Sequence, residues 1–226
     1  MREIIFDTET TGLDPSTGDR LVEIGCIELV NRVPTGRTFH AYFNPDRAMP
    51  IEAERVHGLN DAFLADKQRF HEHALELLAF LGDSPLVAHN AQFDFGFLNY
   101  ELGVCGHPEV MLERMVDTLV LARRRHPGAK HSLDALCMRY GIDRSHRVRH
   151  GALLDAELLA QVYVELTGGR QIGLALAAEV GMTIEVAAFR PRQREFRAPR
   201  PHSASAQELA RHKAFLETLD SALWAC

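Results

Sequence analysis

Two carboxylates stand two residues apart near the start of the chain, directly after a short apolar run. The apolar residues 4–6 lead into the string DTETTG at 7–12. Because side chains alternate along a strand, Asp7 and Glu9 point to the same face, roughly 7 Å apart. Two like charges at the end of a buried strand are costly to desolvate unless a cation lies between them. The pattern favours hard oxygen ligands for Mg²⁺ or Mn²⁺ over a solvated strand end.

Further along the chain, two more carboxylates and a histidine could complete such a site. Asp94 follows a second short apolar segment and begins a helical stretch, where it could also simply stabilise a helix N-terminus. Asp155 lies in the helical run LLDAELL, where it could be an ordinary exposed acid. His150 precedes Asp155 by five residues, a poor match for one helix face. We therefore expect His150 on the loop that enters the helix, unless it is an ordinary loop histidine, and Asp155 in the first turns.

The elements that must position these residues follow from apolar patterning and turn signals. We expect strands near residues 2–9, 20–30, 38–44, 85–89 and 114–117. We expect helices near residues 69–81, 93–103, 118–126, 132–140 and 152–167. Three early strands followed by alternating helices and strands indicate an α/β fold, with a mixed sheet flanked by helices.

Composition limits the classes of protein that the chain can be. At 226 residues it can bury one sizeable core and carry an appendage, and its formal net charge of −6 argues against broad electrostatic gripping of DNA. No apolar stretch is long enough for a membrane span and no signal-peptide pattern is present, so we expect a cytoplasmic protein. Three of the four cysteines, Cys26, Cys105 and Cys137, lie in apolar runs and are expected to be reduced core residues.

In their order along the chain, these motifs resemble a known family. The motifs Asp7-x-Glu9, Asp94 in HNAQFDFGFL, and His150-x4-Asp155 resemble the three exonuclease motifs of the DEDDh (DnaQ-like) superfamily. Within it, the chain is most similar to the proofreading epsilon subunits of bacterial DNA polymerase III, over about residues 1–176. The resemblance implies a ribonuclease-H-like five-stranded mixed sheet with its first three strands antiparallel. It also implies a 3′→5′ DNA exonuclease that removes misinserted nucleotides for a replicative polymerase.

The same resemblance implies a role for each motif residue and two Mg²⁺ or Mn²⁺ ions as cofactors. Asp7 would bridge the metals, Glu9 and Asp155 would help to hold the one that binds the attacking water, and Asp94 would support the second. His150 would take the proton of the water as general base. Besides Asp7, Glu9 and Asp155, the positions that match contacts to the terminal nucleotide are Thr10, Gly12, Val56, His57, Asn90, Ala91 and Phe93. Among these, His57 could be a turn residue and Phe93 a core aromatic.

The character of the chain changes after Gly169. We expect an exonuclease domain over 1–169, a segment and Arg/Pro-rich linker over 170–204, and a helical tail over 205–226, so that the C-terminal part is flexible. The linker arginines are expected to be solvated, although they could touch nucleic acid. Ser205 and Glu208 form a capping-box pattern before an apolar face that has little core of its own. This face could dock back on the exonuclease domain. The resemblance instead favours the alpha subunit of the polymerase as its binding partner.

A short segment just past the last domain helix has a pattern of its own. Gln171, Leu174 and Leu176 resemble the peptides that dock on the bacterial sliding clamp, although the segment could also continue as ordinary helix. The resemblance leaves open a small third subunit of the polymerase core. Two rival functions stay open at this point. A free-standing DNA or RNA exonuclease would not need the tail, and a non-catalytic polymerase-binding module would not need the intact set of acids.

Overall fold

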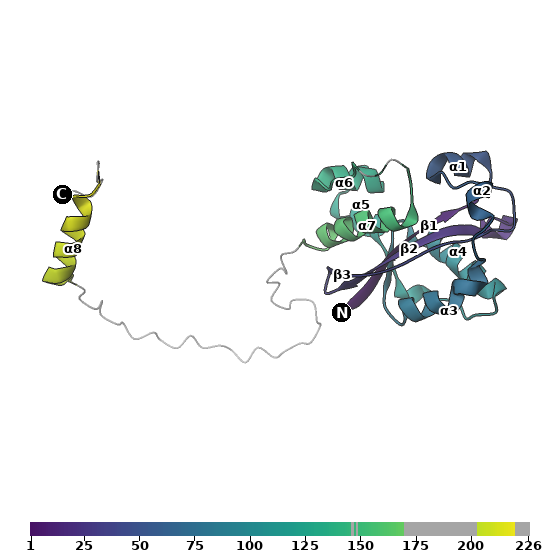
Figure 1. The fold of residues 1–226 in the computed structure, drawn as a ribbon, viewed down its shortest axis with the longest axis horizontal. Coiled ribbons are helices and arrows are strands. Elements are labelled where there is room, and N and C mark those ends of the chain that lie inside the picture. Colours follow the sequence, from purple (N-terminus) through teal and green to yellow (C-terminus); the bar gives the residue numbers. More distant parts are fainter. Residues whose placement is uncertain (146, 148, 170–202, 220–226) are drawn as a thin grey trace. The chain divides into compact units, whose positions relative to one another are not determined.

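The computed structural model describes residues 1–145, 147, 149–169 and 203–219. The chain divides into two units, Met1–Ala175 and Leu176–Cys226, of which residues 1–169, apart from 146 and 148, and residues 203–219 are described (Figure 1). The predicted Arg/Pro-rich linker and the clamp-binding residues Gln171, Leu174 and Leu176 lie outside the described residues, and the predicted domain boundaries stay predictions.

A mixed five-stranded sheet forms the centre of the first unit. The strands are β1 (Arg2–Thr10), β2 (Leu21–Val30), β3 (Val33–Tyr42), β4 (Leu86–Ala88) and β5 (Met115–Asp117), in the spatial order β3-β2-β1-β4-β5. β1, β2 and β3 pair antiparallel, whereas β4 is parallel to β1 and β5 is parallel to β4. The predicted five-stranded α/β sheet with three antiparallel strands is therefore confirmed.

The third strand begins earlier than the sequence pattern indicates. β3 starts at Val33, directly after a two-residue turn, and pairs with β2 from Val30↔Val33 onward, whereas a strand near 38–44 was expected. Residues 33–38 are all exposed, so they carry no apolar alternation. The hairpin pairing with β2, and not burial, makes this segment a strand.

Helices cover both faces of the sheet. They are α1 (Ile51–His57), α2 (Asp61–Leu64), α3 (Phe70–Leu81), α4 (Ala91–Val104), α5 (Thr118–Arg125), α6 (Leu133–Tyr140) and α7 (Ala152–Leu166), with 3-10 turns at Pro15–Thr17 and Leu112–Arg114. α3 to α7 match the predicted helices. The short α1 and α2 were not predicted, because α1 buries only His57 and α2 only Leu64, and so neither has an apolar stripe.

The alternation of side chains along β1 assigns the two faces. Ile4 and Phe6 belong to a core cluster with residues of α3 and α4, whereas Ile5 belongs to a second cluster with residues of α5, α6 and α7. Asp7 and Glu9 have the parity of Ile5 and therefore point towards the α7 face. Thr8 has the parity of Phe6 and points towards the α4 face.

The cysteines agree with the predicted reduced core residues. Cys26 and Cys137 are buried, and Cys105 is half-buried and close to the core cluster of α3 and α4; all three are free thiols. Within the described residues, no helix is long and apolar enough to cross a membrane.

In the second unit, the described residues form one helix, α8 (Ala206–Leu216). Ser205 is its N-cap, and the Ser205 hydroxyl and the Glu208 carboxylate form the predicted capping box. Among the described residues of this helix none is buried, and Leu209 and Phe215 are 57% and 59% exposed.

Candidate active site

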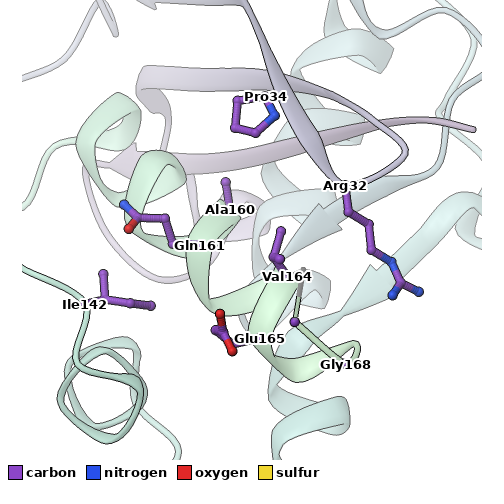
Figure 2. A pocket seen from close by; sticks show the side chains of 9 residues that line it. Arg32, Pro34, Ile142, Ala160, Gln161, Val164, Glu165 and Gly168 are labelled. Carbon is purple, nitrogen blue, oxygen red and sulfur yellow. The ribbon is translucent and has the colours of Figure 1, made fainter. Parts of the chain in front are cut away.

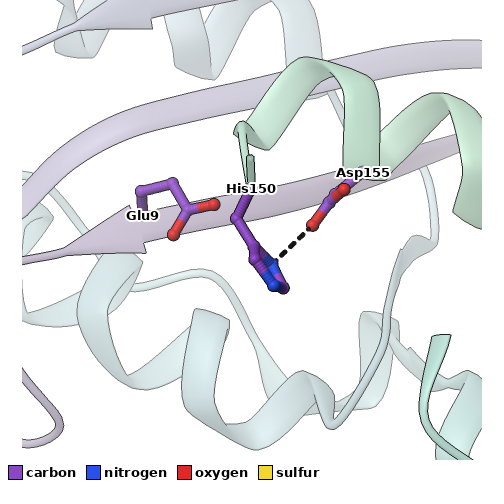
Figure 3. A group of neighbouring side chains, drawn as sticks. All are labelled: Glu9, His150 and Asp155. Atoms are coloured by element: carbon purple, nitrogen blue, oxygen red, sulfur yellow. Dashed lines mark hydrogen bonds and ion pairs between the residues drawn. The ribbon is translucent and has the colours of Figure 1, made fainter. Parts of the chain in front are cut away.

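Glu9, His150 and Asp155 lie together where β1 ends beside the first turn of α7. One ligand atom from each of these side chains lies within 4.8 Å of the others (Figure 3). Glu9 and Asp155 are buried, with 8% and 3% of their surface exposed, whereas His150 is exposed. The imidazole Nδ1 of His150 is 3.1 Å from Oδ2 of Asp155. Two acids and an imidazole from separate parts of the sequence thus converge on one point.

The first turn of α7 is held close to the sheet by a glycine. Gly151 is the N-cap of α7, His150 lies on the loop just before it, and Asp155 lies in the first turn, as the spacing predicts. A Cβ atom added at Gly25 of β2 would lie 2.3 Å from the backbone of Leu153. Only a residue without a side chain allows the helix to approach β2 this closely, and that approach places Asp155 beside Glu9.

Asp94 enters the site from the α4 face of the sheet. It is 3% exposed and lies in the first turn of α4. The hydroxyl of Thr8 donates a 2.7 Å hydrogen bond to Oδ1 of Asp94, which fixes this carboxylate against β1. The turn before α4 has Asn90 in the left-handed region at φ 63°, and its backbone N–H donates to the carboxylate of Asp117 at 3.1 Å. The Asn90 turn and Thr8 therefore set the position of Asp94.

Arg147 supplies a cation inside this acid cluster, and sequence reasoning missed it. Its Nε and Nη2 donate to the two oxygens of Asp155 at 2.5 and 2.6 Å. Nη1 donates to Asp134 at 2.9 Å, and Nη2 also donates to Nδ1 of His150 at 2.7 Å. The only sequence signal was its place in a basic stretch three residues before His150. Thr8 was missed as well, although it stands between the two acids of the first motif.

The electrostatics of Asp7 show that the cluster lacks positive charge. Burial raises the pKa of Asp7 well above its ordinary value, and the charges of Asp94, Glu9 and Asp155 raise it further. Arg147 lowers this pKa, but one guanidinium does not balance the set. Carboxylates with strongly raised pKa values in a cleft are typical of a functional site.

Two other carboxylates in the cluster are perturbed in the same direction. Burial, followed by the charge of Glu23, raises the pKa of Glu9 to about 8. Glu23 lies directly opposite Glu9 in the β1–β2 register, and His40 contacts Glu23 at 2.7 Å. Burial raises the pKa of Asp94 to about 7, although the hydrogen bond from Thr8 lowers it. Both acids would ionise fully at neutral pH only with additional positive charge nearby.

The donor set suits divalent metal ions. Asp7, Glu9, Asp94 and Asp155 offer carboxylate oxygens, the ligands that Mg²⁺ and Mn²⁺ prefer. All four line one hollow of about 520 Å³. A cation bound between Asp7, Glu9 and Asp94 would lower their raised pKa values, because it stabilises the ionised carboxylates. The four predicted ligands therefore fit the divalent metal ions that the resemblance implies.

Two adjoining hollows lie around the acids. The hollow of about 520 Å³ is also lined by Asn90 and Phe93, and one of about 530 Å³ by Thr10, Gly12, Val56, His57 and Phe93. Thr8, Glu9 and Phe93 line both. Ala91 lines neither, because it is fully buried in the core cluster of α3 and α4. Of the seven further predicted nucleotide contacts, the structure therefore gathers six around the acids.

His57 is the most unusual of these residues. Its Nδ1 accepts a 3.0 Å hydrogen bond from the backbone N–H of Leu59, so that its proton lies on Nε2. Among the described residues, Nε2 is buried and has no hydrogen-bond partner. Burial lowers the pKa of His57 more than the nearby backbone of Thr10 raises it, which favours the neutral ring. A buried donor without a partner at the edge of a hollow is suited to bind a ligand.

A third hollow, of about 540 Å³, lies along the C-terminal half of α7 (Figure 2). Arg32 and Pro34 line it from the β2–β3 hairpin, and Ala160 and Val164 line it from α7. Its described lining includes none of the predicted site residues. The chemistry of this protein is therefore expected at the acid cluster.

The fold and this site define an exonuclease. A model of the exonuclease (RNase_T) family matches residues 4–163, and the chain belongs to this family. In the solved structure of exonuclease X in complex with 5′ overhanging duplex DNA, 90% of that chain and 73% of this one superpose with a TM-score of 0.55 and 27% identity.

Within the exonuclease family, the chain belongs to the epsilon subunits of DNA polymerase III. It is 49% identical to that subunit from Rickettsia felis, over 97% of each chain. It is 40% identical to that subunit from Escherichia coli strain K12, over 99% of this chain and 97% of the other.

Proposed function

We propose that the chain is the proofreading subunit of a replicative DNA polymerase III and hydrolyses the 3′-terminal phosphodiester of a DNA strand. The observation that supports this most directly is the convergence of Glu9, His150 and Asp155 within 4.8 Å, beside Asp7 and Asp94 in one hollow. A binding module that had kept only the fold would not need buried acids with raised pKa values.

Each residue of the cluster has a distinct role in this proposal. Asp7, Glu9 and Asp155 would hold one metal ion, and Asp7 and Asp94 would hold a second. Bound Mg²⁺ or Mn²⁺ would lower the pKa of the attacking water and neutralise the scissile phosphate. His150 takes the proton of the water as general base, and its exposed position at the mouth of the hollow leaves the imidazole accessible to substrate. Thr8 keeps Asp94 oriented.

The hollow around His57 is proposed to receive the terminal nucleotide. Thr10 and Gly12 line it at the end of β1 and Val56 lines it from α1, and Phe93 lines both this hollow and that of the proposed metal ligands. The unpaired Nε2–H of His57 would donate to the nucleotide. A strand end that is frayed by a mismatch fits such a hollow better than a paired end, because a base must be separated from its partner to enter.

The activity is tested by removing one metal ligand. Asp155→Ala should abolish degradation of labelled single-stranded DNA while the protein stays folded, because relieving a cluster of acids seldom unfolds a domain. Glu157→Ala, an exposed acid two residues further along α7, is the matched control and should retain full activity. If Asp155→Ala kept most of its activity at saturating Mg²⁺, the assignment of the metal site would be wrong.

We further propose two partners beyond the DNA. α8 binds the alpha subunit of the polymerase, which is supported by the exposure of Leu209 and Phe215 on a helix without a buried face. The segment with Gln171, Leu174 and Leu176 binds the sliding clamp; this proposal is supported by the spacing of the glutamine and the two leucines in the sequence.

The clamp assignment is tested in the assembled complex of polymerase, exonuclease and clamp. Gln171→Ala with Leu174→Ala should leave free exonuclease activity unchanged and make the complex dissociate more readily at raised salt, because a two-anchor peptide depends on tethering for its occupancy. Equal complex stability for mutant and wild type would mean that this segment is only a helix end.

A further inference from the structure

Arg147 occupies the groups that the proposed chemistry requires. Its guanidinium contacts both carboxylate oxygens of Asp155, at 2.5 and 2.6 Å. The side chains of Arg147 and Asp155 are only 9% and 4% exposed. A carboxylate whose two oxygens both accept short charge-assisted hydrogen bonds has little capacity left to ligate a metal ion.

The same guanidinium also contacts the proposed base. Nη2 of Arg147 lies 2.7 Å from Nδ1 of His150. A guanidinium has donors only and stays protonated, so Nδ1 is the acceptor when this contact forms. The approach of Nδ1 to Oδ2 of Asp155 at 3.1 Å is then a contact between two acceptors, which Arg147 bridges by donating to both. Arg147 therefore engages a metal ligand and a nitrogen of the base at once.

A second anchor keeps Arg147 at the site when it leaves Asp155. Nη1 of Arg147 donates to Oδ1 of Asp134, on α6, at 2.9 Å. Asp134 is half-exposed and also pairs with Arg144 at 2.7 Å. Arg147 can thus give up Asp155 and keep Asp134 without becoming an unpaired buried charge.

We propose that Arg147 is a built-in counter-ion that holds Asp155 and His150 while no metal is bound, and that a divalent cation must displace it from Asp155. This inference rests on the proposed metal site. The charge balance supports it, because four carboxylates and one guanidinium line the hollow, and Arg147 is the only arginine or lysine among the described lining residues. The exchange places a doubly charged ion where a single charge stood.

The proposal predicts that substitution of Arg147 increases the affinity for a divalent metal ion. Removal of a residue that merely supports the fold would weaken metal binding or leave it unchanged. Removal of a competitor should strengthen it. Arg147→Gln should bind Mn²⁺ about tenfold more tightly than wild type, which corresponds to about 1.4 kcal/mol. Its metal-free form should melt at a lower temperature, and its stabilisation by Mn²⁺ should be larger.

The experiment measures Mn²⁺ binding to the full chain by calorimetry, together with melting temperatures with and without Mn²⁺. Arg144→Gln is the matched control, because Arg144 shares the partner Asp134 but has no contact with Asp155 within the described residues. It should bind Mn²⁺ like wild type. Arg147→Lys keeps the charge without the two-pronged contact and should lie between wild type and Arg147→Gln, which also covers the case in which Arg147→Gln does not fold.

Two outcomes would overturn the proposal. One is unchanged or weaker Mn²⁺ binding by Arg147→Gln, or by Arg147→Lys if only that variant folds, while wild type binds the metal. The other is an equal gain for Arg144→Gln, which would show a general effect of surface charge. Failure of the metal site itself would appear differently, as an absence of Mn²⁺ binding by wild type, and would count against the proposed function.

Discussion

At the scale of single residues, His150 could act either as a general base or as a metal ligand, and its position bears on which. A ring nitrogen lies within 4.8 Å of carboxylate oxygens of Glu9 and Asp155, yet the His150 side chain is 47% exposed, in contrast to the buried acids. An exposed imidazole at the mouth of a hollow can reach a water molecule and exchange its proton with solvent. A metal ligand would be more deeply enclosed, like the acids. The geometry therefore favours the role of base.

His150→Ala separates the two roles. A general base typically contributes about 10²–10⁴-fold to a rate, so the single-turnover rate on labelled single-stranded DNA should fall by that order. Mn²⁺ affinity, measured by calorimetry, should stay close to the wild-type value. His71→Ala, an exposed histidine on α3, is the control and should change neither quantity. A large loss of Mn²⁺ affinity in His150→Ala would identify the imidazole as a ligand instead.

Glu9 gives a prediction on pH dependence. Its pKa is about 8 in the folded metal-free protein, against an ordinary value of 4.5. Between these values the folded state binds more protons than the unfolded state, so the contribution of Glu9 to stability falls as pH rises through this window. Metal-free Glu9→Gln should therefore gain stability relative to wild type as pH increases from about 6 to about 8.

The measurement is thermal unfolding in the presence of a chelator across that pH range. Using the difference between variant and wild type removes the contributions of titrating groups that do not interact with Glu9, such as His57. The neighbouring Asp7, whose pKa the charge of Glu9 raises, contributes to the remaining difference. Glu157→Gln, at an exposed position, should show a constant difference. Added Mg²⁺ should stabilise wild type more at high pH than at low pH, because the metal requires the ionised carboxylates. A flat difference for Glu9→Gln would contradict the raised pKa.

At the scale of elements, the site depends on how closely α7 approaches β2. The acids of β1 are fixed by strand alternation, but Asp155 meets them only because Gly25 lets the first turn of α7 lie against the sheet. Likewise, Asp94 reaches the site because α4 begins directly after the left-handed Asn90. Substitutions at Gly25 or Asn90 should therefore lower both the stability of the fold and the exonuclease activity.

Gly25→Ala tests the approach of α7. The added methyl group would lie 2.3 Å from backbone atoms of Leu153, and backbone cannot give way as a side chain can. We expect destabilisation of about 1–3 kcal/mol in denaturant unfolding, and a loss of exonuclease activity as Asp155 and His150 shift. Gly96→Ala is the control, because no atom of the described residues lies within 4 Å of its added Cβ. As an exposed helical glycine, it should be neutral or stabilising by up to about 1 kcal/mol.

At the scale of the whole molecule, the proposed catalytic site and the proposed polymerase-binding helix lie in different units of the chain. Every described site residue lies in the first unit, and the exposed apolar side chains of α8 lie in the second. The net charge of −6 agrees with an enzyme that holds a few terminal nucleotides through metals and does not grip a long stretch of DNA. The polymerase would then deliver the strand.

A fragment of residues 1–169 should therefore fold and degrade single-stranded DNA like the full chain. It should no longer co-elute with the polymerase alpha subunit in size-exclusion chromatography. In the full chain, Leu209→Asp with Phe215→Asp should reproduce the loss of binding without any loss of activity, because both side chains are exposed. Retained binding by the fragment would move the interface onto the exonuclease domain.

Sequence by itself determined the identity of the acids, the parity of Asp7 and Glu9 on β1, the loop position of His150 and the capped helix α8. These depend on local patterns: alternation in a strand, spacing along a helix and capping chemistry. Only the tertiary structure decided which side chains meet. Arg147 reaches Asp155, Asp134 and His150, and Thr8 reaches Asp94, through contacts between separate elements. The early start of β3 and the burial of Ala91 were decided in the same way, because pairing and packing with distant residues leave no local signal.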